Sequence, residues 1–92
     1  MAYKRALNIV GMNLRRLRRS IGLTQSDIAA RCQVIGWQLS RETLAKIEAG
    51  YRRVNDAEVV MLARVLGKQV EELLIVSNDR LLEIARHSPA CE

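Results

Sequence analysis

Residues 17–29, with the sequence LRRSIGLTQSDIA, contain the end of one predicted helix and the start of another. The apolar residues of the first helix are spaced by four, three and four positions, as on one helical face: Val10, Leu14, Leu17 and Ile21. Gly22 is typical of a helix end. Thr24, with Asp27 three residues later, forms a variant of the capping box. The stretch therefore predicts a helix that ends near Gly22 and a second helix that begins after Thr24.

The second and third predicted helices are separated by an ambiguous stretch, residues 33–39. The second helix carries a small apolar stripe: Ile28, Ala29 and Cys32. Gly36 is expected to break the helix inside the ambiguous stretch. Ser40 then fits the cap of a third helix over residues 41–49, which ends at Gly50. This helix runs through Leu44, Ala45 and Ile47.

Two further helices and a C-terminal extension complete the predicted fold. Either Asn55 or Asp56 caps the fourth helix, and Gly67 ends it. A short fifth helix follows, and either Ser77 or Asn78 caps a last one. Their apolar residues are Val59, Leu62, Ala63 and Leu66, then Val70, Leu73 and Leu74, then Leu81, Leu82, Ile84 and Ala85. Because no sustained apolar/polar alternation indicates strands, we predict an all-α domain of five short helices with a helical extension.

The composition indicates one domain with an aliphatic core. The chain has 92 residues, 49% of them hydrophobic, but no Phe, one Trp and two Tyr. No apolar run approaches the roughly 18 residues that span a bilayer, and the N-terminus makes a poor signal peptide. Cys32 and Cys91 have neither metal nor redox spacing, and packing in the core is the favoured role for Cys32. We therefore expect a cytoplasmic, reduced protein without membrane association.

Charge is distributed unevenly along the chain. Residues 1–53 carry eleven basic and three acidic side chains, a net charge of +8, whereas residues 54–92 carry four and seven, a net charge of −3. A basic front and an acidic back suggest that one end of the molecule meets a polyanion such as nucleic acid. The alternative is a basic surface that is merely solvated.

Several motifs occur in the order and at the distances of one known family. The first is the stretch at residues 17–29, followed by Leu44-Ala45-Lys46-Ile47-Glu48-Ala49-Gly50, by Ala63-Arg64-Val65-Leu66-Gly67 and by Glu72-Leu73-Leu74. Over roughly residues 8–75 the chain resembles the lambda-repressor-like, or XRE, helix-turn-helix family. The resemblance implies a five-helix DNA-binding domain. We expect an N-terminal arm at residues 1–8, the domain at 9–75 and an extension at 76–92 that contributes to a dimer.

The chain departs from the usual family pattern before the third helix. The distance from Thr24 to Gly50 is about five residues longer than in most members, whose turn has about four residues. The extra length falls near residues 33–37 and resembles a branch with a longer turn. Its four apolar side chains are too many to leave in water: Val34, Ile35, Trp37 and Leu39. We therefore expect an ordered turn, a second helix that extends beyond Cys32, and a Trp37 that is at least half buried.

The resemblance implies that the third helix enters the major groove of double-stranded DNA and that its first turn reads the bases. Arg41 can contact guanine through two hydrogen bonds, and Glu42 can accept one from cytosine. Thr43 can touch a thymine methyl group or donate to a base, and Lys46 follows on the same face. The alternative is that these residues are ordinary surface charges, with Glu42 and Lys46 forming an i,i+4 pair.

Helix ends and basic loops are expected to contact the DNA phosphates. The candidates are Thr24, Gln25, Ser40, Tyr51, Arg52 and Arg53. Gln25 begins the second helix, whose free N–H groups favour an anion, and the resemblance places the matching Gln against DNA. For Ser40 there is an alternative, because as the cap of the third helix its hydroxyl can be consumed inside that helix. Arg52 and Arg53 could instead serve solubility. Lys4 and Arg5 in the arm are further candidates for DNA contact.

The resemblance also implies an ion pair between Arg18 and Glu48. Arg18 lies one helical turn after Leu14 and beside the apolar face, so it cannot point wholly to solvent. Glu48 follows Ile47 near the end of the third helix. Such a pair would fix the first helix against the recognition helix.

The leading hypothesis is a sequence-specific, repressor-type regulator that binds DNA as a homodimer. Val76, Leu81 and Leu82 are the expected dimer residues, because the basic front must face DNA. The alternative is an antitoxin or adaptor whose main role is to bind a second protein, for which the apolar tail at residues 81–85 is the supporting feature. His87 stands alone, and we find no metal cluster, cofactor motif or paired catalytic carboxylates, so we expect no cofactor and no enzymatic activity.

Overall fold

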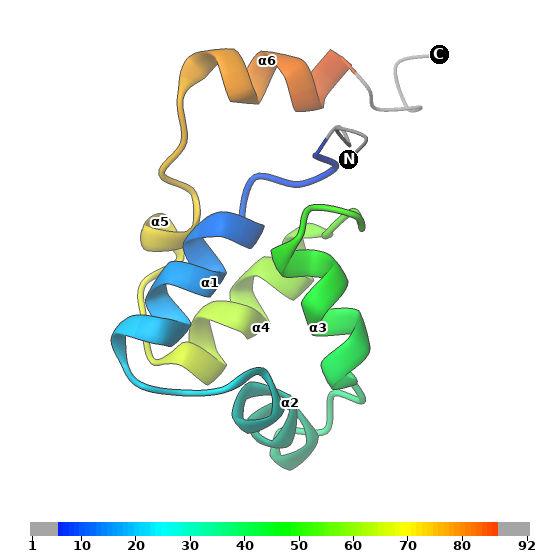
Figure 1. Ribbon diagram of the computed structural model, residues 1–92, viewed down its shortest axis with the longest axis vertical. Coiled ribbons are helices and arrows are strands. Elements are labelled where there is room, and N and C mark those ends of the chain that lie inside the picture. Colours follow the sequence, from blue (N-terminus) through cyan, green and yellow to red (C-terminus); the bar gives the residue numbers. More distant parts are fainter. Residues whose placement is uncertain (1–5, 87–92) are drawn as a thin grey trace.

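Five helices pack around one aliphatic core, and a sixth lies apart from them (Figure 1). The computed structural model describes residues 6–86, and within that range every regular element is helical. The helices are α1 (Gly11–Ser20), α2 (Gln25–Val34), α3 (Arg41–Glu48), α4 (Asp56–Leu66), α5 (Val70–Leu73) and α6 (Asn78–Arg86). The all-α class and the number of helices agree with the sequence prediction. None of these helices is long and apolar enough to cross a membrane.

Local hydrogen bonds set most of the helix boundaries. Thr24 and Asn55 cap α2 and α4, each within a complete capping box. Ser40 caps α3 by accepting a hydrogen bond from a backbone N–H, and Ser77, rather than Asn78, does the same for α6. Gly67 ends α4 with a φ of +69°, a left-handed conformation that favours glycine. These boundaries follow the signals in the sequence.

The core is formed by the apolar stripes of the first five helices. Its fully buried side chains include Leu14, Ile28, Leu44, Ile47, Leu62 and Leu73. Cys32 is also fully buried, and burial raises the pKa of its thiol, which fits the predicted packing role. Ile21 was expected on the core face, and this expectation is wrong. Because α1 ends at Ser20, Ile21 lies beyond the last helical turn and is 36% exposed.

The turn between α2 and α3 is only partly covered. As expected, α2 extends beyond Cys32, Trp37 packs partly buried against the core, and Leu39 is buried. Val34 and Ile35, however, are 85% and 45% exposed, so the expectation that the turn keeps all its apolar side chains out of water is wrong for these two. They lie at the very end of α2, where the chain turns away from the core.

The start of α1 and the end of α3 approach each other backbone to backbone. A side chain at Gly11 would clash with the carbonyl oxygen of Ile47, so only glycine fits there. Asn8 fastens the same contact. Its amide nitrogen donates to the carbonyl oxygens of Ile47 at 3.1 Å and Arg52 at 2.8 Å, and its side-chain oxygen accepts from the N–H of Gly11 at 2.8 Å. The described part of the predicted arm, residues 6–8, is therefore fixed to the domain, while Lys4 and Arg5 lie outside the described residues.

Candidate nucleic-acid interface

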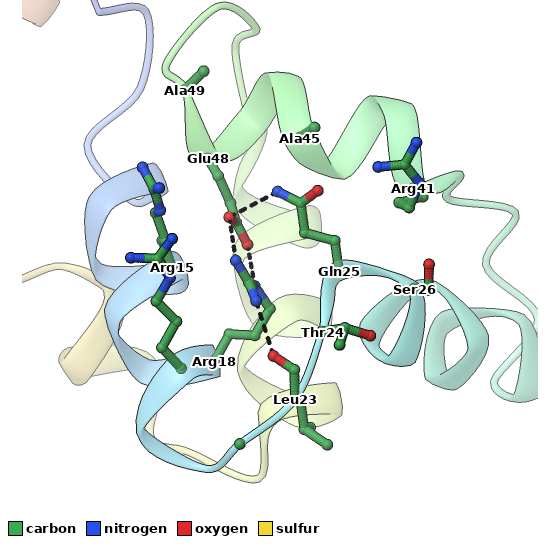
Figure 2. A pocket seen from close by; sticks show the side chains of 12 residues that line it. Arg15, Arg18, Leu23, Thr24, Gln25, Ser26, Arg41, Ala45, Glu48 and Ala49 are labelled. Atoms are coloured by element: carbon green, nitrogen blue, oxygen red, sulfur yellow. Dashed lines mark hydrogen bonds and ion pairs between the residues drawn. The ribbon is translucent and has the colours of Figure 1, made fainter.

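A polar groove of about 580 Å³ runs between α1, the first turn of α2 and α3 (Figure 2). The C-terminal half of α1 forms one wall and α3 forms the other. The loop around Thr24 and the start of α2 form the floor. Several of the predicted functional residues line this groove: Arg18, Thr24, Gln25, Arg41 and Glu48. Residues from three separate helices therefore meet at one surface.

Arg18 and Glu48, the two residues expected to meet, form a bidentate ion pair at the base of the groove. Nε of Arg18 lies 2.7 Å from Oε2 of Glu48, and Nη2 of Arg18 lies 2.9 Å from Oε1. Both residues are buried, with 7% and 6% exposure. The hydrogen bond to Glu48 raises the pKa of the Arg18 guanidinium, although burial acts to lower it. Nη1 of Arg18 also donates to the carbonyl oxygen of Leu23 at 2.8 Å, which ties α1 to the loop before α2.

Gln25 extends this network onto the surface of the groove. Its amide nitrogen donates to Oε1 of Glu48 at 3.0 Å, as the dashed lines in Figure 2 show. Glu48 therefore accepts three hydrogen bonds, two from Arg18 and one from Gln25, and its charge is opposed by a buried cation. The amide of Gln25 is held in place at the start of α2, with its own oxygen left to accept a bond.

Exposed arginines occupy both walls of the groove. Arg15 and Arg19 stand one turn apart on α1, and Arg41 begins α3 on the other side, with its side chain 53% exposed. Arg15 and Arg19 were not among the residues assigned to DNA contact from the sequence. The signal that could have found them is the cluster of four arginines in the acid-free first twenty residues. The groove therefore presents a concentrated positive surface to solvent.

The first turn of α2, at the floor of the groove, is held by a reciprocal capping box. The hydroxyl oxygen of Thr24 accepts from the N–H of Asp27 at 3.0 Å, and the Asp27 carboxylate accepts from the N–H of Thr24 at 2.8 Å. The Asp27 carboxylate is hydrogen-bonded first by the backbone N–H of Thr24 and second by the Thr24 side chain, and these bonds hold the pKa of Asp27 below its usual range. The side chain of Thr24 is therefore engaged with Asp27 within the capping box.

The first turn of α3 leaves its charged side chains exposed but ties up its hydroxyls. Ser40 accepts from the N–H of Thr43 at 3.1 Å, and its hydroxyl lies 3.0 Å from that of Thr43. Arg41 approaches Glu42 at 3.7 Å, a long ion pair between two exposed side chains. Glu42 therefore has Arg41 rather than Lys46 as its nearby cation, and Lys46 is exposed one turn further along α3.

The loop after α3 contains one arginine with a structural role. Arg52 forms a bidentate ion pair with Glu58, at 3.0 and 2.9 Å, and also donates to the carbonyl oxygen of Arg53 at 2.8 Å. This pairing raises the pKa of Arg52 and lowers that of Glu58. Tyr51 and Arg53 are exposed in the same loop. From the sequence, Arg52 was expected to contact phosphate or to serve solubility. Its partner Glu58 was not foreseen, because the two residues meet only once the loop folds back onto α4.

The expected dimer residues lie outside the groove. Leu81 and Leu82 on α6 are 43% and 45% exposed, and Val76 is partly buried before the helix. No group of three or more His, Cys, Asp or Glu side chains within residues 6–86 is arranged to hold a metal ion. His87 and Cys91 lie outside the described residues.

Comparison with known proteins gives one match. A family model described as helix-turn-helix matches residues 14–73, about two thirds of the chain. The matched part begins at Leu14 in α1 and ends at Leu73 in α5, so it contains the whole groove floor and α3 but leaves out α6. No curated protein and no solved structure matches the chain.

Proposed function

Because the chain belongs to the lambda-repressor-like (XRE) helix-turn-helix family, whose members are DNA-binding regulators, we propose that it is a sequence-specific repressor that reads the major groove with α3. The observation that carries the proposal is the polar groove. Exposed arginines line both of its walls, and the buried Arg18 neutralises the carboxylate of Glu48 at its base. A phosphate backbone that follows this groove meets positive charge on both sides.

Base recognition is proposed for the exposed residues at the start of α3. Arg41 and Lys46 supply donors suited to guanine, and Glu42 supplies an acceptor suited to cytosine. Since the hydroxyl of Thr43 lies within hydrogen-bond distance of Ser40, its methyl group is the part best suited to a base, against a thymine methyl. These contacts would give the sequence preference.

Phosphate contacts are proposed along the floor and walls of the groove. Thr24 and Gln25 stand at the N-terminus of α2, where backbone N–H groups and the helix dipole favour an anion. Arg15 and Arg19 add charge from α1. Tyr51, Arg53 and Ser40 remain candidates, whereas Arg52 is proposed to act mainly through its pairing with Glu58, which shapes the loop that carries Arg53.

A homodimer is part of the proposed function. One domain of this size covers about half a turn of DNA, and two domains related by a two-fold axis can read half-sites about 34 Å apart. The exposed Leu81 and Leu82 on α6 support α6 as the pairing element, together with Val76 before it. The same two leucines support a second candidate function, an antitoxin or adaptor that covers a partner protein, which copurification of a second small protein would favour.

Selection of bound sequences from a random duplex library tests the proposal. We expect one enriched motif with two-fold symmetry, and loss of one base preference in Arg41→Ala. Arg64→Ala is the matched control, because Arg64 is exposed on α4 and does not line the groove. Failure to enrich any sequence, together with equal affinity for all duplexes, would contradict sequence-specific recognition.

A further inference from the structure

α6 is the element that packs least against the rest of the molecule. None of its nine residues, all of which the structure describes, is buried. Figure 1 shows the helix lying across one end of the molecule, joined to α5 by an extended segment. Leu81 and Leu82 are nearly half exposed although the helix has a clear apolar side. A short amphipathic helix that packs so little against its own domain exposes apolar surface that is normally covered on folding.

An apolar hollow of about 450 Å³ lies between α6 and the helices below it. Most of its lining is aliphatic. Leu7, Val10, Val54 and Val59 come from the main body, and Leu81 and Ile84 come from α6. These aliphatic side chains face each other across the hollow without filling it, so they make fewer packing contacts there than in a closed core.

Contacts within the same chain hold α6 in this position, apart from the main body. Asn13 on α1 donates its amide hydrogens to the carbonyl oxygens of Leu73 at 3.1 Å and Ile75 at 2.7 Å. Only Val76 and Ser77 separate this clamp from the start of α6. Within α6, Arg80 contacts the sulfur of Met12 at 3.6 Å. Because the connection is short and fastened, α6 cannot move inward to fill the hollow without breaking these contacts.

We propose that α6 of a second copy of this chain fills the hollow, with Leu82 as the inserted side chain. This inference rests on the homodimer of the proposed function and names the surface that receives the second copy. Leu82 neighbours Leu81 on the helix but lies outside the lining of its own hollow. On the same helical face as Leu82 are Asp79 and Arg86, three residues before it and four after it.

The lining of the hollow includes charges that match this face. Arg53 and Asp56 both line the hollow, one basic and one acidic. An α6 helix laid across the hollow can therefore place Asp79 near Arg53 and Arg86 near Asp56, on either side of Leu82. Each copy inserts its α6 into the hollow of the other copy, so both hollows are occupied and the contact closes as a two-fold dimer.

The same hollow adjoins the end of the recognition helix. Its lining includes Asn8, which bonds to the carbonyl oxygens of Ile47 and Arg52, and Val54 from the loop after α3. A second copy docked there would press on the segment that fastens the end of α3. Dimer formation and the placement of α3 on DNA are coupled in this arrangement.

Mixed disulfide crosslinking tests the proposal on the full chain. In a Cys91→Ser background, a Leu82→Cys protein is mixed with a Val54→Cys protein and oxidised mildly, because Val54 lines the hollow that Leu82 is proposed to enter. Because a disulfide forms only when the two Cβ atoms come within about 4.5 Å, we expect a mixed species of twice the 10.4 kDa chain mass. Val34→Cys replaces Val54→Cys in the matched control, since Val34 is highly exposed and does not line the hollow, and should give no mixed species. Crosslinking of Leu82→Cys only to itself would overturn the proposal, and so would a monomer at every concentration.

Filling the hollow from within the same chain gives an independent measurement. Ala85 lines the hollow, so Ala85→Phe should occupy it and weaken dimerisation about tenfold in sedimentation equilibrium, with helical content retained. If the two α6 helices simply packed on each other, the added apolar surface would leave association unchanged or strengthen it, which would overturn the proposal. DNA binding by wild-type protein is measured alongside. A protein that dimerises but does not bind DNA would contradict the proposed function alone. A protein that binds DNA but does not form the mixed crosslink would contradict this inference alone.

Discussion

Breaking the Arg18–Glu48 pair should destabilise the protein strongly. In Glu48→Met the carboxylate that accepts three hydrogen bonds is lost. Arg18 then remains charged although its residue is only 7% exposed, and it keeps its hydrogen bond to the carbonyl oxygen of Leu23. The amide of Gln25 loses its acceptor as well. An unpaired buried charge of this kind is costly because the surrounding protein cannot replace the water that solvates it.

The size of the effect follows from burial. Removing one partner of a buried ion pair costs about 3–5 kcal/mol, against roughly 1 kcal/mol or less for an exposed pair. With both partners under a tenth exposed, the buried value applies. A domain of this size has a total stability of about 5–14 kcal/mol, so the loss is a large fraction of it. Since 1 kcal/mol corresponds to about 4–8 °C, the Tm should fall by at least about 12 °C.

A double-mutant cycle gives the decisive assay. Arg18→Met, Glu48→Met and the double variant are unfolded by urea and by heat, followed by circular dichroism. We expect the double variant to be more stable than either single variant, because two methionines leave no unpaired charge in the core. The control cycle uses Arg52 and Glu58, which also pair through two bonds but are more exposed, and it should give smaller losses.

Two results would contradict a buried ion pair between Arg18 and Glu48. The first is a loss below about 1 kcal/mol in both single variants, which is the range of a solvated surface pair. The second is a double variant less stable than both singles, which would mean that Arg18 and Glu48 contribute separately rather than as a pair.

The remaining predictions concern DNA affinity and pH. The logarithm of DNA affinity should fall with the logarithm of salt concentration with a slope of about −5 if about six phosphates are contacted. In the same salt titration, Arg15→Ala or Arg19→Ala should each reduce the steepness of the slope by about 1. A slope near zero would rule out the groove as a phosphate site. Arg41→Ala should cost about 1–3 kcal/mol on the selected sequence and much less on random DNA, so equal losses on both would show that Arg41 reads no base. The pKa of Glu58 is lowered on folding, chiefly by its hydrogen bond with Arg52. The stabilisation by ionised Glu58 is therefore present above the unfolded pKa of about 4.3 and is lost as the pH falls through the lower folded pKa. In urea unfolding at a series of pH values, Glu58→Gln should remove this part of the acid destabilisation, and an unchanged pH profile would contradict it.

The elements that sequence reasoning located well are those with local causes. Thr24, Asn55 and Gly67 mark helix ends through hydrogen bonds or dihedral angles within a few residues, and the apolar spacing of α1 and α4 identifies the core face. The same reasoning failed at Ile21. The apolar spacing continues through it, but the helix has already ended, so its side chain is left at the surface.

The candidate interface was only partly accessible to the sequence. The family resemblance implied the pairing of Arg18 with Glu48, which no local pattern indicates and which the structure shows. It also implied a DNA contact for the first turn of α3, which stays a prediction. Arg15 and Arg19 were not predicted from the sequence to contact DNA. Their position on the wall of the groove depends on how α1 lies against α3, and that angle is set by residues distant in the sequence.

Local sequence patterns were enough to predict short helices around an aliphatic core, with a basic N-terminal part and an acidic C-terminal part. Helical periodicity and capping operate over three or four residues, so they can be read along the chain. Which side chains meet depends instead on the packing of the whole domain. The Arg18–Glu48 pair spans 30 positions, and the contact from Asn8 to Ile47 spans 39. Such contacts depend on the packing of whole helices, because the buried surface that fixes their crossing comes from many residues at once.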